Sequence, residues 1–119
     1  MGENHFSRDV RLLTPTHFGN VFQQAISAPS PCITLLARHN DLSYARLGIT
    51  VAKKKIKRAH ERNRVKRLIR ESFRHNKAEL GNIDIVVIAK QGLDQLSNEQ
   101  IFVQLEELWK KIIRRCNTH

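Results

Sequence analysis

Positively charged side chains are concentrated in one segment of this 119-residue sequence. Between Lys53 and Lys77 there are twelve Lys or Arg residues, opposed only by Glu61 and Glu71. The whole chain has 21 basic and 11 acidic residues, so the remainder has nine of each and no net charge. Arg offers a planar fork that matches phosphate oxygens, and Lys offers a point charge. This concentration of positive charge is typical of a protein that binds a polyanion such as nucleic acid.

A helix over residues 59–76 would place most of this charge on one side. Residues at the helical spacing form an apolar inner stripe, namely Val65, Leu68, Ile69, Ser72 and Phe73. On a helical wheel the opposite side gathers polar and basic residues, namely Asn63, Lys66, Arg67, Arg70 and Arg74. Such a face can follow a phosphate backbone, with an affinity that falls steeply as salt rises.

The elements that must position this helix are predicted from apolar periodicity and turn residues. Segments 32–38, 46–52 and 83–90 are predicted strands. The first two are joined by a short polar loop, which predicts an antiparallel hairpin. The third is continuously apolar, as expected in the interior of a sheet. The basic helix then connects the second predicted strand to the third.

Two further helices are predicted at the ends of the chain. Thr14 and Pro15 begin the first, whose apolar stripe is Phe18, Val21, Phe22 and Ala25. The second begins with a capping box at Ser97-Asn98-Glu99-Gln100. The order α-β-β-α-β-α predicts a single α+β domain over residues 1–119, a two-layer sandwich with a small mixed sheet. The sequence does not decide whether residues 1–10 are ordered.

The titratable residues show no pattern for protein-borne catalysis or metal binding. The six His residues are scattered, at positions 5, 17, 39, 60, 75 and 119. The acidic residues Asp41, Glu79, Asp84 and Asp94 do not pair at short spacing. Cys32 and Cys116 are far apart, which favours two reduced thiols. We therefore predict no catalytic residue and no metal ligand in the protein.

The chain also lacks the patterns that direct a protein to membranes or to secretion. No stretch approaches the roughly 20 apolar residues that span a bilayer. The first residues have no charged start followed by an apolar run. We therefore predict a cytoplasmic protein without a membrane partner.

The basic segment resembles a known signature. The motif Arg62-Asn63-Arg64-x-Lys66-Arg67-Leu68-x-Arg70-Glu71 is similar to the arginine-asparagine-arginine signature of the bacterial ribonuclease P protein family. Three more blocks resemble other parts of that family: residues 11–22 its first helix, 46–54 the strand before the signature, and 84–90 its last strand. The four blocks occur in the family's order and spacing, and the resemblance covers residues 11–115.

The resemblance implies a fold and two RNA-binding surfaces. The fold is an α-β sandwich with a left-handed β-α-β crossover through the signature helix, whereas parallel crossovers are generally right-handed. The surface for the catalytic RNA would comprise Lys54, Arg58, Arg62, Asn63, Arg64, Lys66, Arg67 and Arg70. The surface for the single-stranded 5′ leader of precursor tRNA would be a cleft comprising Phe18, Phe22, Thr50, Lys53, Lys57 and Lys90.

The resemblance further implies that the protein assists a catalytic RNA in the endonucleolytic removal of the 5′ leader. In that family the RNA binds Mg²⁺ and cleaves the phosphodiester, so the protein alone would need no cofactor. By holding the leader and neutralising phosphates, it would broaden the substrate range and lower the Mg²⁺ demand. The implied partners are the ribonuclease P RNA and the precursor tRNA leader, without an obligate protein partner.

Three other functions remain open on the residues alone. A ribosomal RNA-binding or assembly protein would share the charge and size. A DNA-binding regulator would use residues 62–74 as a recognition helix, but two short helices should then lead into it, and a strand does instead. An autonomous metal-dependent nuclease would have to cleave RNA without an RNA partner.

Overall fold

The structure, a computed structural model, describes residues 25–118. Four strands form the sheet: β1 (Ile26–Pro29), β2 (Ile33–His39), β3 (Arg46–Val51) and β4 (Ile83–Ala89). The helical elements are α2 (Ala59–Leu80), the 3-10 turn η2 (Leu93–Gln95) and α3 (Asn98–Asn117). The predicted first helix, with Phe18 and Phe22, lies outside the described residues.

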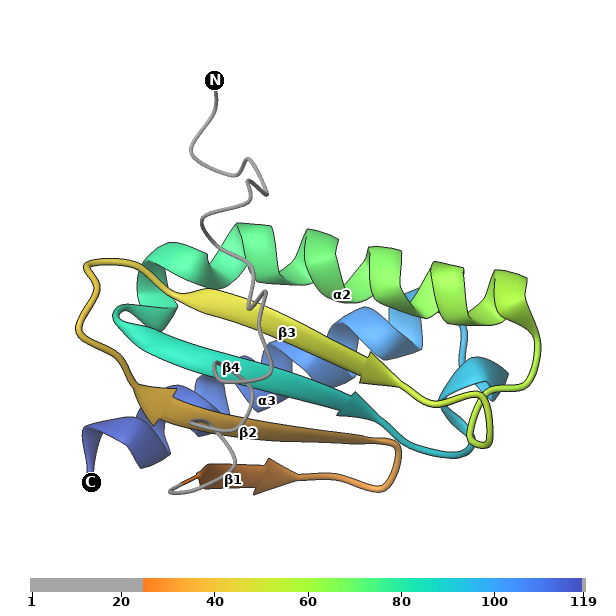
Figure 1. The fold of residues 1–119 in the computed structure, drawn as a ribbon, viewed down its shortest axis with the longest axis horizontal. Helices are drawn as coiled ribbons and strands as arrows, with labels where there is room; N and C mark the ends of the chain where they lie inside the picture. Colours follow the sequence, from red (N-terminus) through yellow and green to blue (C-terminus); the bar gives the residue numbers. More distant parts are fainter. Residues whose placement is uncertain (1–24, 119) are drawn as a thin grey trace.

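The sheet has the strand order β1-β2-β4-β3. β1 and β2 are antiparallel, β2 and β4 are antiparallel, and β3 and β4 are parallel. The helices α2 and α3 pack against each other, and α3 crosses behind the sheet in Figure 1. Within the described chain this is the predicted α+β sandwich with a mixed sheet.

The connection from β3 through α2 to β4 is left-handed. In Figure 1, β3 and β4 both point to the right, and β4 lies below β3. The returning helix belongs to the layer behind the sheet, because α2 and α3 contribute to the same buried cluster. A path that runs right in front, left behind and then downward turns as a left-handed helix. The hand implied by the family resemblance is therefore confirmed.

The predicted hairpin between segments 32–38 and 46–52, which correspond to β2 and β3, is wrong. β4 inserts between β2 and β3, so these two strands are not paired. The physical reason is that β4 is buried on both of its faces and is apolar except for Asp84, which pairs with Arg46 of β3, so it fits best in the centre of the sheet. The hairpin that does form joins β2 to β1, a strand that the sequence reading missed. β1 is an edge strand, where Pro29 is tolerated.

The inner side of α2 confirms the predicted stripe, because Val65, Leu68, Ile69, Ser72 and Phe73 are all buried. The helix runs on to Leu80 and ends at Gly81, whose φ of 72° suits a residue without a side chain. In the core, the Trp109 ring meets Phe73 edge-on at 6.2 Å between centroids, and its Nε1 donates to Ser72 Oγ at 2.8 Å. The basic helix is thereby held firmly by one side.

Candidate nucleic-acid interface

The outer side of α2 carries the polar and basic residues predicted for it, namely Asn63, Lys66, Arg67, Arg70 and Arg74. Asn63 and Arg67 are exposed, and the other three are half-buried. The Arg67 side chain is 59% exposed, and its Nε lies 4.0 Å from Glu71 Oε1, a loose surface pair. This face therefore offers guanidinium and ammonium groups to a ligand from solvent.

The loop between β3 and α2 adds a second group of cations. Its exposed members are Lys53, Lys54, Lys55, Lys57 and Arg58. Ile56 in the middle of the loop is completely buried, which anchors the loop in the core and turns its neighbours outward. Arg62 strengthens this arrangement, because its Nη1 donates to the carbonyls of Ile56 (2.9 Å) and Lys57 (2.8 Å).

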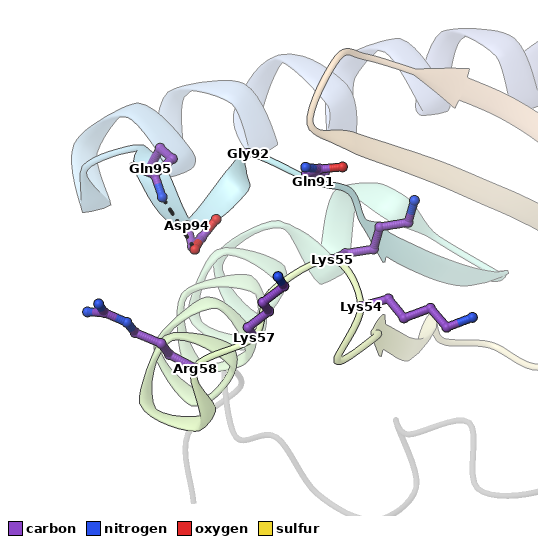
Figure 2. A pocket seen from close by; sticks show the side chains of 8 residues that line it. All are labelled: Lys54, Lys55, Lys57, Arg58, Gln91, Gly92, Asp94 and Gln95. Carbon is purple, nitrogen blue, oxygen red and sulfur yellow. Dashed lines mark hydrogen bonds between the residues drawn. The ribbon is translucent and has the colours of Figure 1, made fainter.

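A cation-lined pocket of about 360 Å³ lies between this loop and the segment that follows β4 (Figure 2). We call it the basic pocket; its lining residues are Lys54, Lys55, Lys57, Arg58, Gln91, Gly92, Asp94 and Gln95. The lining has one carboxylate, that of Asp94, and four cationic side chains. The amino end of α2 also borders it, and the side chain of Arg58 at the N-cap position does not cap that end. The positive end of the helix dipole adds to the attraction for an anion.

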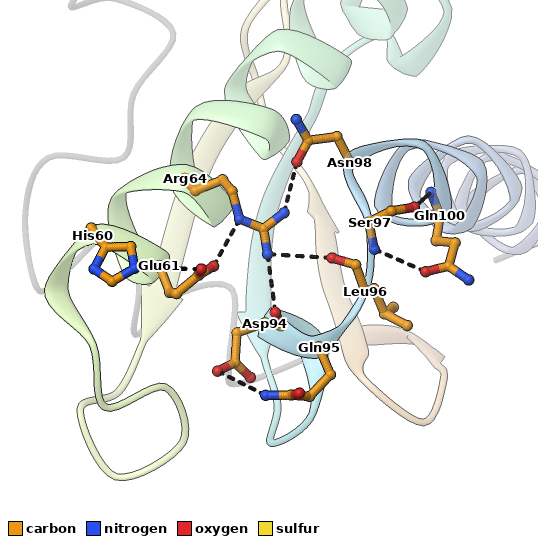
Figure 3. Close-up of polar contacts among 9 residues, drawn as sticks. All are labelled: His60, Glu61, Arg64, Asp94, Gln95, Leu96, Ser97, Asn98 and Gln100. Carbon is orange, nitrogen blue, oxygen red and sulfur yellow. Dashed lines mark hydrogen bonds and ion pairs between the residues drawn. The ribbon is translucent and has the colours of Figure 1, made fainter.

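Arg64 differs from its neighbours because its guanidinium is bonded within the protein (Figure 3). Its Nε donates to Glu61 Oε2 at 2.7 Å, and its Nη1 donates to Asn98 Oδ1 at 2.7 Å. Its Nη2 donates to the carbonyls of Asp94 (3.1 Å) and Leu96 (3.3 Å). The hydrogen bond from Arg64 lowers the pKa of Glu61 below its ordinary value. Arg64 thus links α2 to η2 and to the start of α3.

The residues predicted for a leader cleft lie at the end of the sheet where β3 and β4 both finish. Thr50 is exposed on the sheet face opposite the helices, in a cross-strand row with Ile88 and Thr34. Lys53 follows β3, and Lys90 follows β4, where its Nζ donates to the carbonyl of Ser30 at 3.0 Å. Lys57 lies on the basic pocket. The structure therefore brings these four residues to one end of the domain.

Sequence reasoning missed the far wall of the basic pocket, which Gln91, Gly92, Asp94 and Gln95 form. None of these residues belongs to the basic segment. The available signal is topological: parallel strands end at the same edge of a sheet, so the loops after β3 and β4 must be neighbours. The predicted hairpin paired β3 with β2 and not with β4, so it did not place the loops after β3 and β4 next to each other.

Among residues 25–118, no helix is long and apolar enough to cross a membrane. Within the same range, no three His, Cys, Asp or Glu side chains lie together as a metal ion would require.

A two-layer α+β domain with a solvent-facing basic helix and an adjoining basic pocket defines a nucleic-acid-binding protein. The sequence model of the family described as Ribonuclease P matches residues 6–113. The chain belongs to the bacterial ribonuclease P protein family. Membership places it in tRNA processing, as the protein subunit that works with ribonuclease P RNA.

Individual relatives agree with this membership. The chain is 63% identical to the ribonuclease P protein component of Pseudoalteromonas atlantica over 116 residues, covering 98% of this chain and 97% of that one. It is 56% identical to the component of Histophilus somni over 109 residues, covering 92% of each.

Solved structures show the same likeness. A Staphylococcus aureus RNase P protein mutant matches with a TM-score of 0.82 and 31% identity, covering 87% of both chains. The RNase P protein of Thermotoga maritima matches with a TM-score of 0.74 and 32% identity, covering 85% of this chain and 96% of that one.

Proposed function

We propose that the chain binds the ribonuclease P RNA through α2 and the loop before it, and binds the 5′ leader of precursor tRNA at the end of the sheet. The observation that carries this proposal is the two-sided character of α2. Its apolar side is fixed in the core, and its basic side is turned to solvent. Such a helix can meet a phosphate backbone without rearranging the domain.

The RNA-facing surface comprises residues with exposed or half-exposed side chains, namely Lys54, Arg58, Asn63, Lys66, Arg67 and Arg70. Asn63 contributes a neutral donor and acceptor that suits a ribose hydroxyl. Arg62 and Arg64 belong to the same signature, but both make hydrogen bonds to protein carbonyls. Both bonds from Arg62 to the described residues use Nη1, so its Nε and Nη2 can add to the RNA contact.

The leader site comprises Thr50, Lys53, Lys57 and Lys90, together with Phe18 and Phe22 of the preceding segment. Unpaired bases stack on aromatic rings with about 1–3 kcal/mol per base, and Lys side chains hold the backbone. Thr50 is exposed on β3, where a single strand of RNA can reach it.

The proposed mechanism is differential binding. Precursor tRNA carries a leader and mature tRNA does not, so leader contacts stabilise the substrate complex more than the product complex. The bond cleavage itself rests with the RNA and its Mg²⁺. By neutralising RNA phosphates, the protein lowers the Mg²⁺ concentration that the complex needs. The substrates that gain most are those whose own features bind the RNA poorly. We also propose that the protein works in the cytoplasm.

Reconstitution tests the assignment directly. Purified protein is added to ribonuclease P RNA at low Mg²⁺, and removal of the leader from precursor tRNA is followed. We expect clear stimulation over RNA alone. A folded protein that gives no stimulation, but binds ribosomal RNA, would support a ribosomal assembly role instead.

The RNA-facing surface is tested with Arg67→Ala. We expect weaker binding to ribonuclease P RNA and a slope of log K against log salt that is shallower by about 0.7–0.9, because one phosphate contact is lost. Lys110→Ala, an exposed charge on α3, is the matched control and should leave the slope unchanged. Equal slopes for both variants would refute the surface.

The leader site is tested with Phe18→Ala. The variant should bind precursor and mature tRNA complexes with more nearly equal affinity than the wild type does. Retention of the full wild-type preference for precursor would contradict the leader site and leave the RNA-subunit surface intact.

A further inference from the structure

We infer that Arg64, the second arginine of the signature, is a positioning residue that holds one wall of the basic pocket, and that it does not bind RNA itself. The inference deepens the proposed function and rests on it. It assigns different tasks to arginines that look equivalent in the sequence.

The first observation is that Arg64 has little donor capacity left. A guanidinium has five N–H donors, and four of those in Arg64 are engaged by acceptors from Glu61, Asp94, Leu96 and Asn98. A bidentate grip on a phosphate needs two parallel donors. Arg64 would have to break protein bonds to provide them. Its side chain is also only 22% exposed.

The second observation is the contrast with Arg67, one turn further along the same helix. The Arg67 side chain is 59% exposed, and its carboxylate partner among residues 25–118, Glu71, is 4.0 Å away. Its fork can turn toward a phosphate at little cost. The two residues have the same charge and the same helix, so they form a natural matched pair for an experiment.

The third observation is where the acceptors of Arg64 lie. Asp94, whose carbonyl accepts from Arg64, lines the basic pocket. Leu96, whose carbonyl also accepts from Arg64, directly follows Gln95, another lining residue. Arg64 therefore fixes the far wall of the pocket to α2. Arg62 holds the near wall in the same way, through the carbonyls of Ile56 and Lys57. Together the two signature arginines set the distance between the walls.

The geometry also predicts that Lys cannot replace Arg64. Its four acceptors surround a planar group and come from two segments of the chain, the first turn of α2 and residues 94–98. A single ammonium keeps the charge but cannot span that arrangement. At a simple phosphate contact, Lys would instead preserve much of the attraction.

The test compares wild type, Arg64→Lys, Arg67→Lys, Asn98→Ala and Arg67→Ala, so that both arginines receive the same charge-conserving change. The affinity of each full-length protein for ribonuclease P RNA is measured against salt, at a temperature where circular dichroism shows all of them folded. We expect Arg64→Lys and Asn98→Ala to weaken binding by about threefold to tenfold, as for residues that bias a binding surface without touching the ligand. Arg67→Lys should stay closer to the wild-type affinity, because Lys preserves much of the attraction at a phosphate contact. The salt slope of Asn98→Ala should equal that of the wild type, whereas Arg67→Ala should have a shallower slope.

Asn98→Ala removes no charge and lies on α3, so it keeps the test decisive if Arg64→Lys fails to fold. The double variant Arg64→Lys/Asn98→Ala should bind the RNA no more weakly than Arg64→Lys alone, because both changes break the same Arg64–Asn98 hydrogen bond. Wild-type affinity in Arg64→Lys, or a shallower slope in it, overturns the positioning role alone. Failure of the wild type to bind this RNA overturns the proposed function and this inference together.

Discussion

Glu61 is an acidic residue inside a strongly basic helix, and its contact with Arg64 explains its presence there. The bond from Arg64 Nε to Glu61 Oε2 is 2.7 Å long and lowers the pKa of Glu61. In the unfolded chain this bond is absent, so the folded protein releases the Glu61 proton more readily. The contribution of this residue to stability is therefore present above the ordinary Glu range and is lost as the pH falls through the lowered pKa.

This linkage predicts the behaviour of Glu61→Gln. Between about pH 5 and pH 3 the free energy of unfolding should fall less steeply in this variant than in the wild type, because the variant lacks the titrating group. Urea unfolding at several pH values measures the effect. Glu79→Gln, exposed near the end of α2, should parallel the wild type. Identical pH profiles for Glu61→Gln and the wild type would contradict the linkage.

Ser72 is a polar residue on the buried side of α2, where it accepts the Trp109 Nε1 proton at 2.8 Å. Ser72→Ala leaves that indole donor buried without a partner, which should lower the free energy of unfolding by about 1–3 kcal/mol. Since Trp109 is the single tryptophan, its fluorescence follows both the local environment and the unfolding transition. Ser43→Ala, in an exposed loop, is the control and should be neutral.

For single residues, the sequence predicted which side chains are buried or exposed but not which groups they form hydrogen bonds with. Its helical spacing predicted that Ser72 would be buried, but not that Trp109 would bond to it. It likewise predicted that Arg67 would face outward, yet it could not separate Arg67 from Arg64. Apart from Glu61, the acceptors of Arg64 lie some thirty residues away, as for Asp94 at a separation of 30. Such partners become known only when the chain is folded.

Among the elements, α3 shows how local signals specify a helix start. Ser97 Oγ accepts from Gln100 N at 3.1 Å, and Gln100 Oε1 accepts from Ser97 N at 2.8 Å. The capping box predicted from the sequence is therefore confirmed. Ser97→Ala should lower the free energy of unfolding by about 1 kcal/mol, measured by urea denaturation. A loss below the error of that measurement would show that α3 is held by packing alone.

The other elements divide in the same way between local and distant causes. β2, β3, β4, α2 and α3 could be predicted because alternation, helical spacing and caps lie within each segment. The pairing of the strands could not, because it depends on which strand best fills the centre. The wall of the basic pocket at Asp94 and Gln95 could not be predicted either, since its position follows from the pairing of β3 with β4.

For the whole molecule, the unequal distribution of charge has a cost in the free protein. The net charge is +10, and it resides in the segment of Lys53 to Lys77, where like charges repel. Salt screens this repulsion, so the Tm of the free protein should rise between about 20 and 200 mM NaCl. Arg67→Gln should show a smaller rise. A Tm that falls with salt would mean that attractive pairs, such as Arg64 with Glu61, outweigh the repulsion.

The central place of β4 also affects how the molecule is built during synthesis. β1 and β2 leave the ribosome first and can pair with each other, but β3 finds its neighbour only when Ile83–Ala89 follows. Until then α2 has no completed sheet to lie on, and its arginines have no fixed spacing. A chain that ends before β4 therefore carries the full basic segment of Lys53 to Lys77 without the sheet that shapes its binding surface.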